Sequence, residues 1–324
     1  MKTSYEQIVD ITKIGRHGAV DLNAIFALAE QEKFAPAVSD GKRRLLLAID
    51  VQKDFIEGPQ WTPTGNSEYD QLMADLCKGG SLAVPGSIGD VERLTRFIYN
   101  NLGYITKIMS SLDTHIAQQI FHPCWWVNAA GNHPAPYTII THDDLTAGNW
   151  NAIIASKKSV EYLKGLEQTA KKQLCVWPYH CIVGTEGHTL ENEFAKMVYF
   201  HSVARKGQNP MIRKGDDPYS EMYGIIKPEY SESNFINTPV LTAVETYDEI
   251  YVAGEAASHC LMESVRQIAE HFATRPEITQ KIIILEDCTS PIPGYEAETA
   301  QVFDMFKKNY GIRFAKSTDI TLAA

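Results

Sequence analysis

Short, continuously apolar runs, each closed by a polar or glycine-bearing turn, constrain the fold of this 324-residue chain more than any other feature. Continuous rather than alternating hydrophobicity suits strands that are covered on both faces, as in a parallel sheet. The runs occupy residues 45–51, 105–112, 197–203, 249–254 and 281–285. We therefore predict that they form the strands of one mainly parallel central sheet.

Helical patterns separate these runs. Apolar residues recur at spacings of three and four between residues 91 and 98, between 261 and 272, and between 300 and 306. Alternating strands and helices predict a three-layer α/β sandwich with right-handed crossovers.

The chain is expected to form one domain over residues 41–324, preceded by a helical extension at 1–40. A segment at about 121–175 breaks the regular pattern and is predicted to be an insertion. Long irregular segments in a compact domain are usually lids or binding loops. The insertion could also form a subunit contact in a homo-oligomer.

Composition excludes several classes of protein. A formal net charge of −10 argues against a nucleic-acid surface, which would need clustered Lys and Arg. The sequence has no apolar signal core at its start and no run of 18 apolar residues, so we expect a cytoplasmic protein without a membrane partner. The six cysteines form no CxxC pair, and in a reducing compartment they are expected to be thiols.

Potential metal ligands follow the second apolar run. Asp113 and His115 are separated by one residue, and strand residues at this spacing point to the same side. His180 is a candidate third ligand and His122 a candidate fourth. Mixed carboxylate and imidazole ligation suits Zn²⁺, Mn²⁺ or Fe²⁺. Rival histidines in the same region are His133, His142 and His188. Spacing alone leaves open that these histidines only cap turns.

A candidate nucleophile follows the fourth run. Cys260 begins a predicted helix, whose dipole favours a thiolate and whose free N–H groups can face a developing oxyanion. Asp50 closes the first run and Lys214 lies in a polar segment, so they supply an acid–base group and a cation. Each residue alone could be structural: a buried thiol, a turn cap or a surface charge. Their coincidence at separate strand ends favours a catalytic site.

Six motifs occur in a fixed order over residues 45 to about 290. They are DVQKDF from Asp50, LAVPG from Leu82, DTH from Asp113, WPYHC from Trp177, RKG from Arg213 with Tyr219-Ser220 after it, and GEAASHC from Gly254. Together they resemble the isochorismatase-like cysteine hydrolases and, within that superfamily, the nicotinamidases. Isochorismatase-type members generally lack the DxH and WPxHC ligands, so the presence of both favours the nicotinamidase branch.

The resemblance implies a role for each matching residue. It implies a catalytic set of Asp50, Lys214 and Cys260, an oxyanion hole made by the N–H groups of Ala256 and Cys260, metal ligands Asp113, His115 and His180 with His122 a weaker fourth, and ring-binding walls Phe55 and Trp177. It also implies a cis peptide bond between Glu255 and Ala256. Plain core packing is the alternative for the two walls. Lys206-Gly207 offers a rival lysine, but it lacks the Tyr-Ser sequel.

The expected reaction is hydrolysis of nicotinamide, or a closely similar aromatic carboxamide, to the acid and ammonia through a thioester. One divalent metal, Zn²⁺ foremost, is the expected cofactor. Two alternatives stay open: another amidase of the superfamily acting on ureido, biuret-like or other small amides, and a catalytically silent ligand-binding relative. Residues 1–40 and the insertion exceed the compact family pattern and leave the exact substrate open.

Overall fold

A parallel six-stranded sheet forms the centre of the molecule in the computed structural model, which describes residues 1–323. In spatial order its strands are β10 (Arg313–Ala315), β9 (Ile282–Leu285), β8 (Glu249–Gly254), β1 (Arg44–Ile49), β2 (Lys107–Asp113) and β7 (Met211–Lys214). Every pair of neighbouring strands is parallel. All six residues of β1 are buried, as its uninterrupted apolar sequence predicted.

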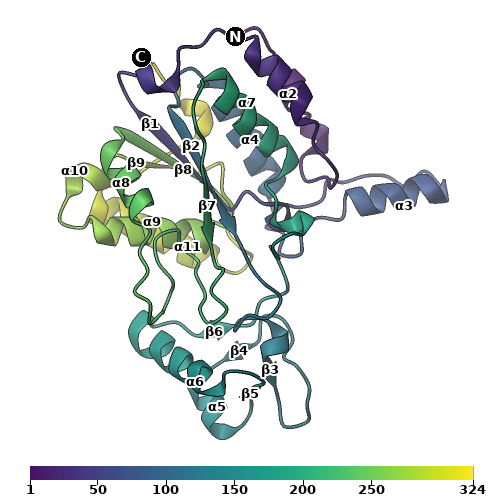
Figure 1. Ribbon diagram of the computed structural model, residues 1–324, viewed down its shortest axis with the longest axis vertical. Helices are drawn as coiled ribbons and strands as arrows, with labels where there is room; N and C mark the ends of the chain where they lie inside the picture. Colours follow the sequence, from purple (N-terminus) through teal and green to yellow (C-terminus); the bar gives the residue numbers. More distant parts are fainter. Residues whose placement is uncertain (324) are drawn as a thin grey trace.

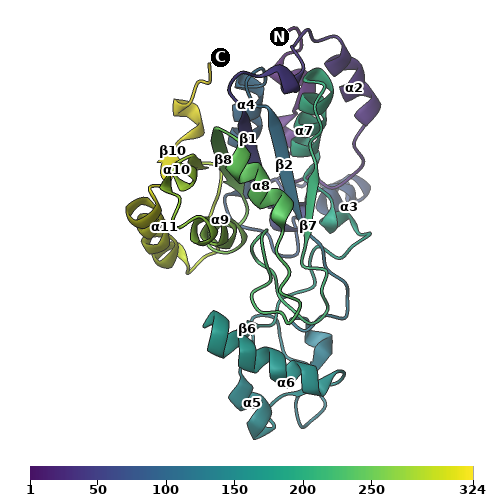
Figure 2. The same cartoon turned by 60° about the vertical axis from the view of Figure 1, so that its left-hand side comes forward.

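Helices cover both faces of this sheet (Figures 1 and 2). One face packs against α4 (Ser87–Asn100) and α7 (Asn192–Ala204), and the other against α8 (Thr238–Thr246), α9 (Cys260–His271) and α11 (Glu296–Tyr310). Successive residues of β1 point to opposite faces, so Leu46 belongs to the first apolar core and Leu47 to the second. The predicted three-layer α/β sandwich is confirmed.

The predicted strand at residues 197–203 is wrong, because these residues lie inside the helix α7. α4 and α2 (Leu22–Glu30) both pack against α7, which therefore buries apolar residues on several sides. A helix buried in this way has the same continuous apolar run as a buried strand, and periodicity cannot separate the two. The strand beside β2 is instead β7, in the polar segment that follows α7, where no strand was predicted.

The first forty residues pack on the face of the sheet that carries α4 and α7. They contain α1 (Tyr5–Ile8), η1 (Ile11–Lys13), α2 and η2 (Ala37–Ser39). Ile8, Ile14 and Ile25 are buried in the same apolar core as α4 and α7. The Gly15 N–H group donates a 3.1 Å hydrogen bond to Glu191, whose carboxylate also caps α7. The extension therefore thickens one outer layer of the sandwich.

A separate lobe lies beyond the carboxyl ends of β2 and β7 (Figures 1 and 2). It is built from η4 (Pro123–Trp125), β3 (Trp126–Val127), β4 (Ile139–Ile140), α5 (His142–Ala147), β5 (Asn151–Ala152), α6 (Ser156–Gly165), η5 (Leu166–Ala170) and β6 (Leu174–Cys175). Trp125, Trp126 and Leu163 are buried in its own apolar cluster. Lys172 ties the lobe to the main body through ion pairs with Glu229 and with Glu263 on α9.

Shorter helices complete the chain: η3 (Lys53–Phe55), α3 (Ser67–Leu76), η6 (Glu186–His188), α10 (Pro276–Thr279) and η7 (Ser317–Asp319). α3 projects from the main body beside the end of α7 (Figure 1). Among residues 1–323, every helix is too short or too polar to cross a lipid bilayer.

The histidine at the centre of the α7 layer should make stability depend on pH. His201 is fully buried; its Nε2–H donates to the Ile105 carbonyl at 2.9 Å and its Nδ1 accepts from Asn209. Burial lowers its pKa to about 4, so the folded protein holds a neutral imidazole where the unfolded chain titrates near its ordinary 6.5. Its contribution to stability is complete above pH 6.5 and is lost as the pH falls toward 4.

We expect the His201→Gln protein to lose about 2 kcal/mol less free energy of unfolding than the unchanged protein between pH 7 and pH 5. Urea unfolding at the two pH values measures this difference. Equal losses in both proteins would show that His201 is not buried as a neutral ring.

Candidate active site

The carboxyl ends of four neighbouring strands bring the candidate residues together. Asp50 directly follows β1, Asp113 ends β2 and Lys214 ends β7, with Asp113 and Lys214 opposite each other in the sheet register. β8 ends beside β1, and a short loop leads from it to Cys260 at the first position of α9. Residues more than 200 positions apart in the chain therefore meet at the carboxyl-terminal end of the sheet.

Lys214 lies at the centre of this group. Its Nζ is 2.9 Å from Asp50 Oδ2, 2.9 Å from Asp113 Oδ1 and 3.7 Å from Cys260 Sγ. The side chains of Lys214 and Asp50 are fully buried. Asp50 also accepts a 2.5 Å hydrogen bond from the Ser111 hydroxyl. The structure thus places the predicted thiol, carboxylate and ammonium in mutual contact.

The rival Lys206 is not part of this group, because it is exposed at the end of α7. Its Lys-Gly sequence is a chance repeat of the motif at Lys214.

Burial and charge decide the protonation states in this cluster. Burial acts to lower the pKa of Lys214, but the attraction of Asp113 and Asp50 outweighs it and holds this pKa well above its usual value, so the lysine is charged. Burial raises the pKa of Cys260 well above that of a free thiol; Lys214 opposes this shift, and Asp50 and Asp113 add to it. The resting Cys260 is therefore a thiol, although the helix dipole by itself favours the thiolate. Burial also raises the pKa of Asp50, which suits it to take up a proton.

The loop before Cys260 presents backbone donors to the thiol. The Glu255–Ala256 peptide bond is cis, as predicted. Among residues 1–323, the N–H groups of Ala256 and Cys260 have no carbonyl or side-chain partner. Ala256 and Cys260 both line the cavity beside the lysine cluster. Two free donors next to a thiol can hydrogen-bond an oxygen that gains negative charge.

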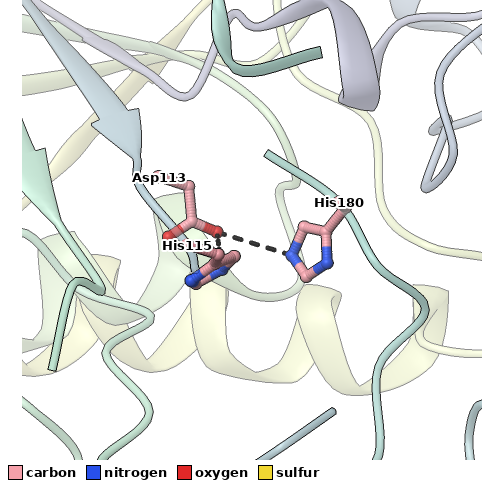
Figure 3. A group of neighbouring side chains, drawn as sticks. All are labelled: Asp113, His115 and His180. Atoms are coloured by element: carbon pink, nitrogen blue, oxygen red, sulfur yellow. Dashed lines mark hydrogen bonds and ion pairs between the residues drawn. The ribbon is translucent and has the colours of Figure 1, made fainter. Parts of the chain in front are cut away.

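A second cluster adjoins the lysine. Asp113, His115 and His180 offer ligand atoms that all lie within 4.8 Å of one another, and all three side chains are buried (Figure 3). Asp113 Oδ2 is 3.0 Å from His115 Nε2 and 3.6 Å from His180 Nε2. Burial acts against a charge on Asp113, but His115 and Lys214 outweigh it and hold the pKa of this carboxyl well below its usual value. Asp113 is thus an ionised carboxylate shared by both clusters.

The imidazoles are oriented as metal ligands are. His115 Nδ1 lies 3.1 Å from the Gly215 carbonyl and His180 Nδ1 lies 2.7 Å from the Pro178 carbonyl, so each ring turns its Nε2 toward Asp113 Oδ2, where a shared cation would lie. His122 donates from Nδ1 to Ala117, and its buried Nε2 has no partner among the described residues. The ring centroid of His122 is 5.9 Å from that of His115. This donor set fits a divalent cation.

The rival histidines lie outside this group. His188 is bonded to Thr114 through Nε2, His133 to Trp126 through Nδ1, and His142 lies near Asp143. They belong to none of the sets of converging ligand atoms among residues 1–323.

A cavity with aromatic and apolar walls opens onto both clusters. Phe55 and Trp177 line it together with Cys260, Asp113 and His180. Phe55 packs edge-on against the His180 ring at 5.6 Å between centroids. Both aromatic residues therefore face the cavity as well as the surrounding core.

Comparison with known proteins finds nicotinamidases by sequence and by structure. The nicotinamidase of Escherichia coli (strain K12) is 27% identical over 199 residues, which are 60% of this chain and 71% of that protein. The solved structure of an Acinetobacter baumanii nicotinamidase/pyrazinamidase has a TM-score of 0.53 at 17% identity, covering 87% of this chain and 99% of its own. The yeast nicotinamidase bound to the inhibitor nicotinaldehyde has a TM-score of 0.54 at 17% identity and covers 84% of this chain and 99% of its own. No protein-family model matches the sequence.

The chain is similar in sequence to a nicotinamidase and shares the fold of the solved nicotinamidase structures. The predicted resemblance is confirmed.

Several residues of the nicotinamidase-like site were missed from the sequence. Glu221, Tyr223 and His259 also line the cavity. Glu221 is fully buried, and burial raises its pKa. Trp177 donates from Nε1 to the Tyr223 hydroxyl at 3.2 Å. Their positions directly after the lysine motif and directly before Cys260 were the signals available.

Gln52 is a further residue that the sequence analysis missed. It supports the site through hydrogen bonds to the backbone of Asp113. Its side chain accepts from the Asp113 N–H at 2.7 Å and donates to the Asp113 carbonyl at 2.9 Å. This paired hydrogen bond fixes the backbone that carries the shared carboxylate.

Proposed function

We propose that this protein is a metal-dependent cysteine amidohydrolase that hydrolyses nicotinamide to nicotinate and ammonia. One observation carries the proposal: a buried thiol, carboxylate and ammonium lie in contact beside a cluster of metal-ligand type, at a cavity with aromatic walls. The sequence likeness to a nicotinamidase supports the same reaction.

Cys260 is the proposed nucleophile and Asp50 its proton acceptor. As Sγ attacks the amide carbon, its proton passes to the Asp50 carboxylate, and the N–H groups of Ala256 and Cys260 bind the oxyanion. Collapse of this adduct breaks the C–N bond, and Asp50 returns the proton so that ammonia leaves. A water molecule then attacks the thioester while Asp50 accepts its proton, and the acid and the free thiol are released.

Lys214 has an electrostatic role in this scheme. Two carboxylates, Asp50 and Asp113, lie on either side of its ammonium at 2.9 Å. Without that charge, like-charge repulsion would force a proton onto one of them and remove the base. The lysine therefore keeps Asp50 ionised next to a neutral thiol.

Asp113, His115 and His180 would hold a divalent cation, with Zn²⁺ as the foremost candidate. His122 lies outside the set of converging ligand atoms and is the weaker proposed fourth ligand, because its buried Nε2 has no partner among residues 1–323. When bound, such a cation would offer a Lewis acid to the ring nitrogen of a pyridine carboxamide. Phe55 and Trp177 would bind the faces of the ring and direct the carboxamide toward Cys260.

An ammonia-release assay tests the proposed substrate. Nicotinamide should yield ammonia and nicotinate, and benzamide, which lacks the ring nitrogen, should react more slowly. If a ureido or biuret-like amide yields ammonia and nicotinamide does not, the proposed substrate is wrong and the enzyme acts on another amide of the superfamily. Failure of every amide would leave a ligand-binding protein.

Metal content gives a prediction about the histidines. Loss of a metal-bound imidazole should lower metal affinity by at least the roughly 10–100-fold that removal of an outer hydrogen-bond partner costs. We expect His115→Ala and His122→Ala each to lose bound zinc, measured by elemental analysis and by competition with a chromogenic chelator. His188→Ala is the matched control, since this ring lies nearby and is bonded to Thr114 instead. Unchanged zinc affinity in His122→Ala would remove it from the ligand set.

A further inference from the structure

Two carboxyl groups meet behind the loop that carries the oxyanion donors. Glu255 and Asp90 are 1% and 3% exposed, and Ser290 donates to both carboxyl groups, from its hydroxyl to Asp90 and from its N–H to Glu255. Oε1 of Glu255 is buried and has no donor among the described residues. This pair lies outside the cluster of Lys214 and the metal-ligand cluster.

The partners of Asp90 indicate which of the two groups is ionised. Asp90 accepts from Arg93 Nη2 at 2.8 Å and from the Ser290 hydroxyl at 2.6 Å. Glu255 accepts only from the Ser290 N–H, at 3.5 Å. Two buried carboxylates in contact would repel each other strongly, and such pairs hold a proton between them. A proton on Glu255 Oε1 would give that atom a partner, because it could donate to Asp90.

Short connections join this pair to the oxyanion loop. Glu255 itself forms the peptide bond to Ala256, whose N–H is one of the two free donors. Ser290, the hydrogen-bond partner of both carboxyl groups, accepts through its carbonyl from the Ala257 N–H at 2.8 Å. The Ser258 hydroxyl accepts from the Ile292 N–H at 3.0 Å, which fastens the same two segments. A shift of Glu255 away from Asp90 would therefore move the Ala256 donor.

We propose that Glu255 and Asp90 share one proton, and that Glu255 is a positioning residue that holds the Ala256 N–H in the oxyanion hole. The positioning role rests on the proposed function, because it assigns the Ala256 N–H to the oxyanion. The shared proton depends only on the contact between the two carboxyl groups.

The charges around the pair set the direction of its pH dependence. Burial, and after it the neighbouring Asp90, raises the pKa of Glu255 well above its ordinary value, and Glu57 adds to this. Arg93 is the cation in this group and is bonded to Asp90. As the pH rises, loss of the shared proton leaves two adjoining carboxylates, which separate and displace the loop.

The shared proton is tested without any substrate. Difference infrared spectroscopy at pH 7 should show a protonated carboxyl band in the unchanged protein that disappears in Glu255→Gln. Glu193→Gln is the matched control, since Glu193 is equally buried but is paired with Lys196 on α7. The urea midpoint of the unchanged protein should also fall relative to that of Glu255→Gln as the pH rises from 5 to 8, because the folded protein keeps a proton that the unfolded chain releases. Identical spectra and parallel midpoints would overturn the shared proton.

The positioning role is tested by kinetics on an amide that the unchanged protein hydrolyses. Glu255→Ala should lower kcat by about 10²-fold with little change in KM, as expected for a misplaced oxyanion donor. Glu255→Gln should lose less, because its amide can still donate to Asp90, and its decline in activity at alkaline pH should begin at higher pH than that of the unchanged protein. Asp90→Asn should shift the alkaline decline in activity in the same direction. This variant provides the test if Glu255→Gln does not fold. An unshifted decline in both variants would overturn the positioning role.

The two sets of outcomes separate this inference from the proposed function. Absence of hydrolysis of every amide by the unchanged protein would refute the proposed function and with it the positioning role, while the infrared and urea results would still decide the shared proton.

Discussion

Replacing Cys260 with alanine is expected to lower ammonia release from nicotinamide by on the order of 10⁶-fold, to the background of the uncatalysed reaction plus binding. The Cys260 sulfur is the atom that forms the proposed thioester, and it is the sulfur that lies 3.7 Å from the Lys214 ammonium and lines the cavity. Lys214, Asp50 and the two free N–H groups all converge on this position. The measurement is kcat/KM by coupled ammonia detection at saturating zinc.

Cys77→Ala is the matched control for this substitution. Cys77 is also buried, but it lies at the end of α3 and away from the strand ends. It should leave kcat/KM unchanged, while circular dichroism confirms that both variants are folded. Activity in Cys260→Ala above a tenth of that of the unchanged protein would contradict the role of this thiol.

Replacing Asp50 with asparagine should cost about 10⁴-fold in kcat, at the upper end of what general acid–base catalysis contributes. The resting Cys260 is a thiol because burial and two carboxylates raise its pKa, so the attack needs a base in contact with it. The amide of asparagine keeps the size of the side chain and can still accept from Ser111. It cannot take the proton.

The rate of Cys260 alkylation provides a second measure for Asp50→Asn. Iodoacetamide should react at least as fast with the variant at neutral pH, because loss of the Asp50 charge removes one of the groups that raise the pKa of Cys260, while zinc content stays the same. A lower kcat with an equally reactive thiol would then locate the defect in the lost base. A variant that keeps kcat within an order of magnitude of the unchanged protein would show that another group is the base.

The sheet was predictable because parallel strands buried on both faces have uninterrupted apolar sequences. β1, β2, β8 and β9 each coincide with such a run. Residues 197–203 have the same composition, but α7 obtains its burial from α4 and α2 rather than from neighbouring strands. Burial on several sides removes the amphipathic signal from a helix, so the sequence alone could not separate the two structures.

The candidate residues were predictable where the chemistry lies at a strand end. Asp50, Asp113 and Lys214 all follow or end parallel strands, and the sheet brings them into contact. Glu221 and Tyr223 follow the lysine motif, but they lie on a loop whose path depends on packing against the lobe, so their place in the sequence alone did not show that they line the cavity. The protonation state of Cys260 was also out of reach, because it depends on burial and on two carboxylates from distant strands.

The ion pairs that join the lobe to the main body and to α9, the helix that begins at Cys260, could not be predicted either. Lys172 lies in a polar segment whose sequence has no distinguishing pattern. Its ammonium reaches Glu229 and Glu263 because the lobe folds back on the main body. Its ammonium also lies 5.4 Å from the centre of the Tyr223 ring, a wall of the cavity. Contacts of this kind depend on tertiary structure alone.

The most direct measurement of the proposed chemistry is mass spectrometry of the protein after acid quenching during turnover of nicotinamide. We predict a mass increase equal to one nicotinoyl group, located on the peptide that contains Cys260, lost on incubation with hydroxylamine and absent from Cys260→Ala. Ammonia release without any such adduct on this peptide, under conditions where Asp50→Asn also fails to accumulate one, would contradict a thioester at Cys260.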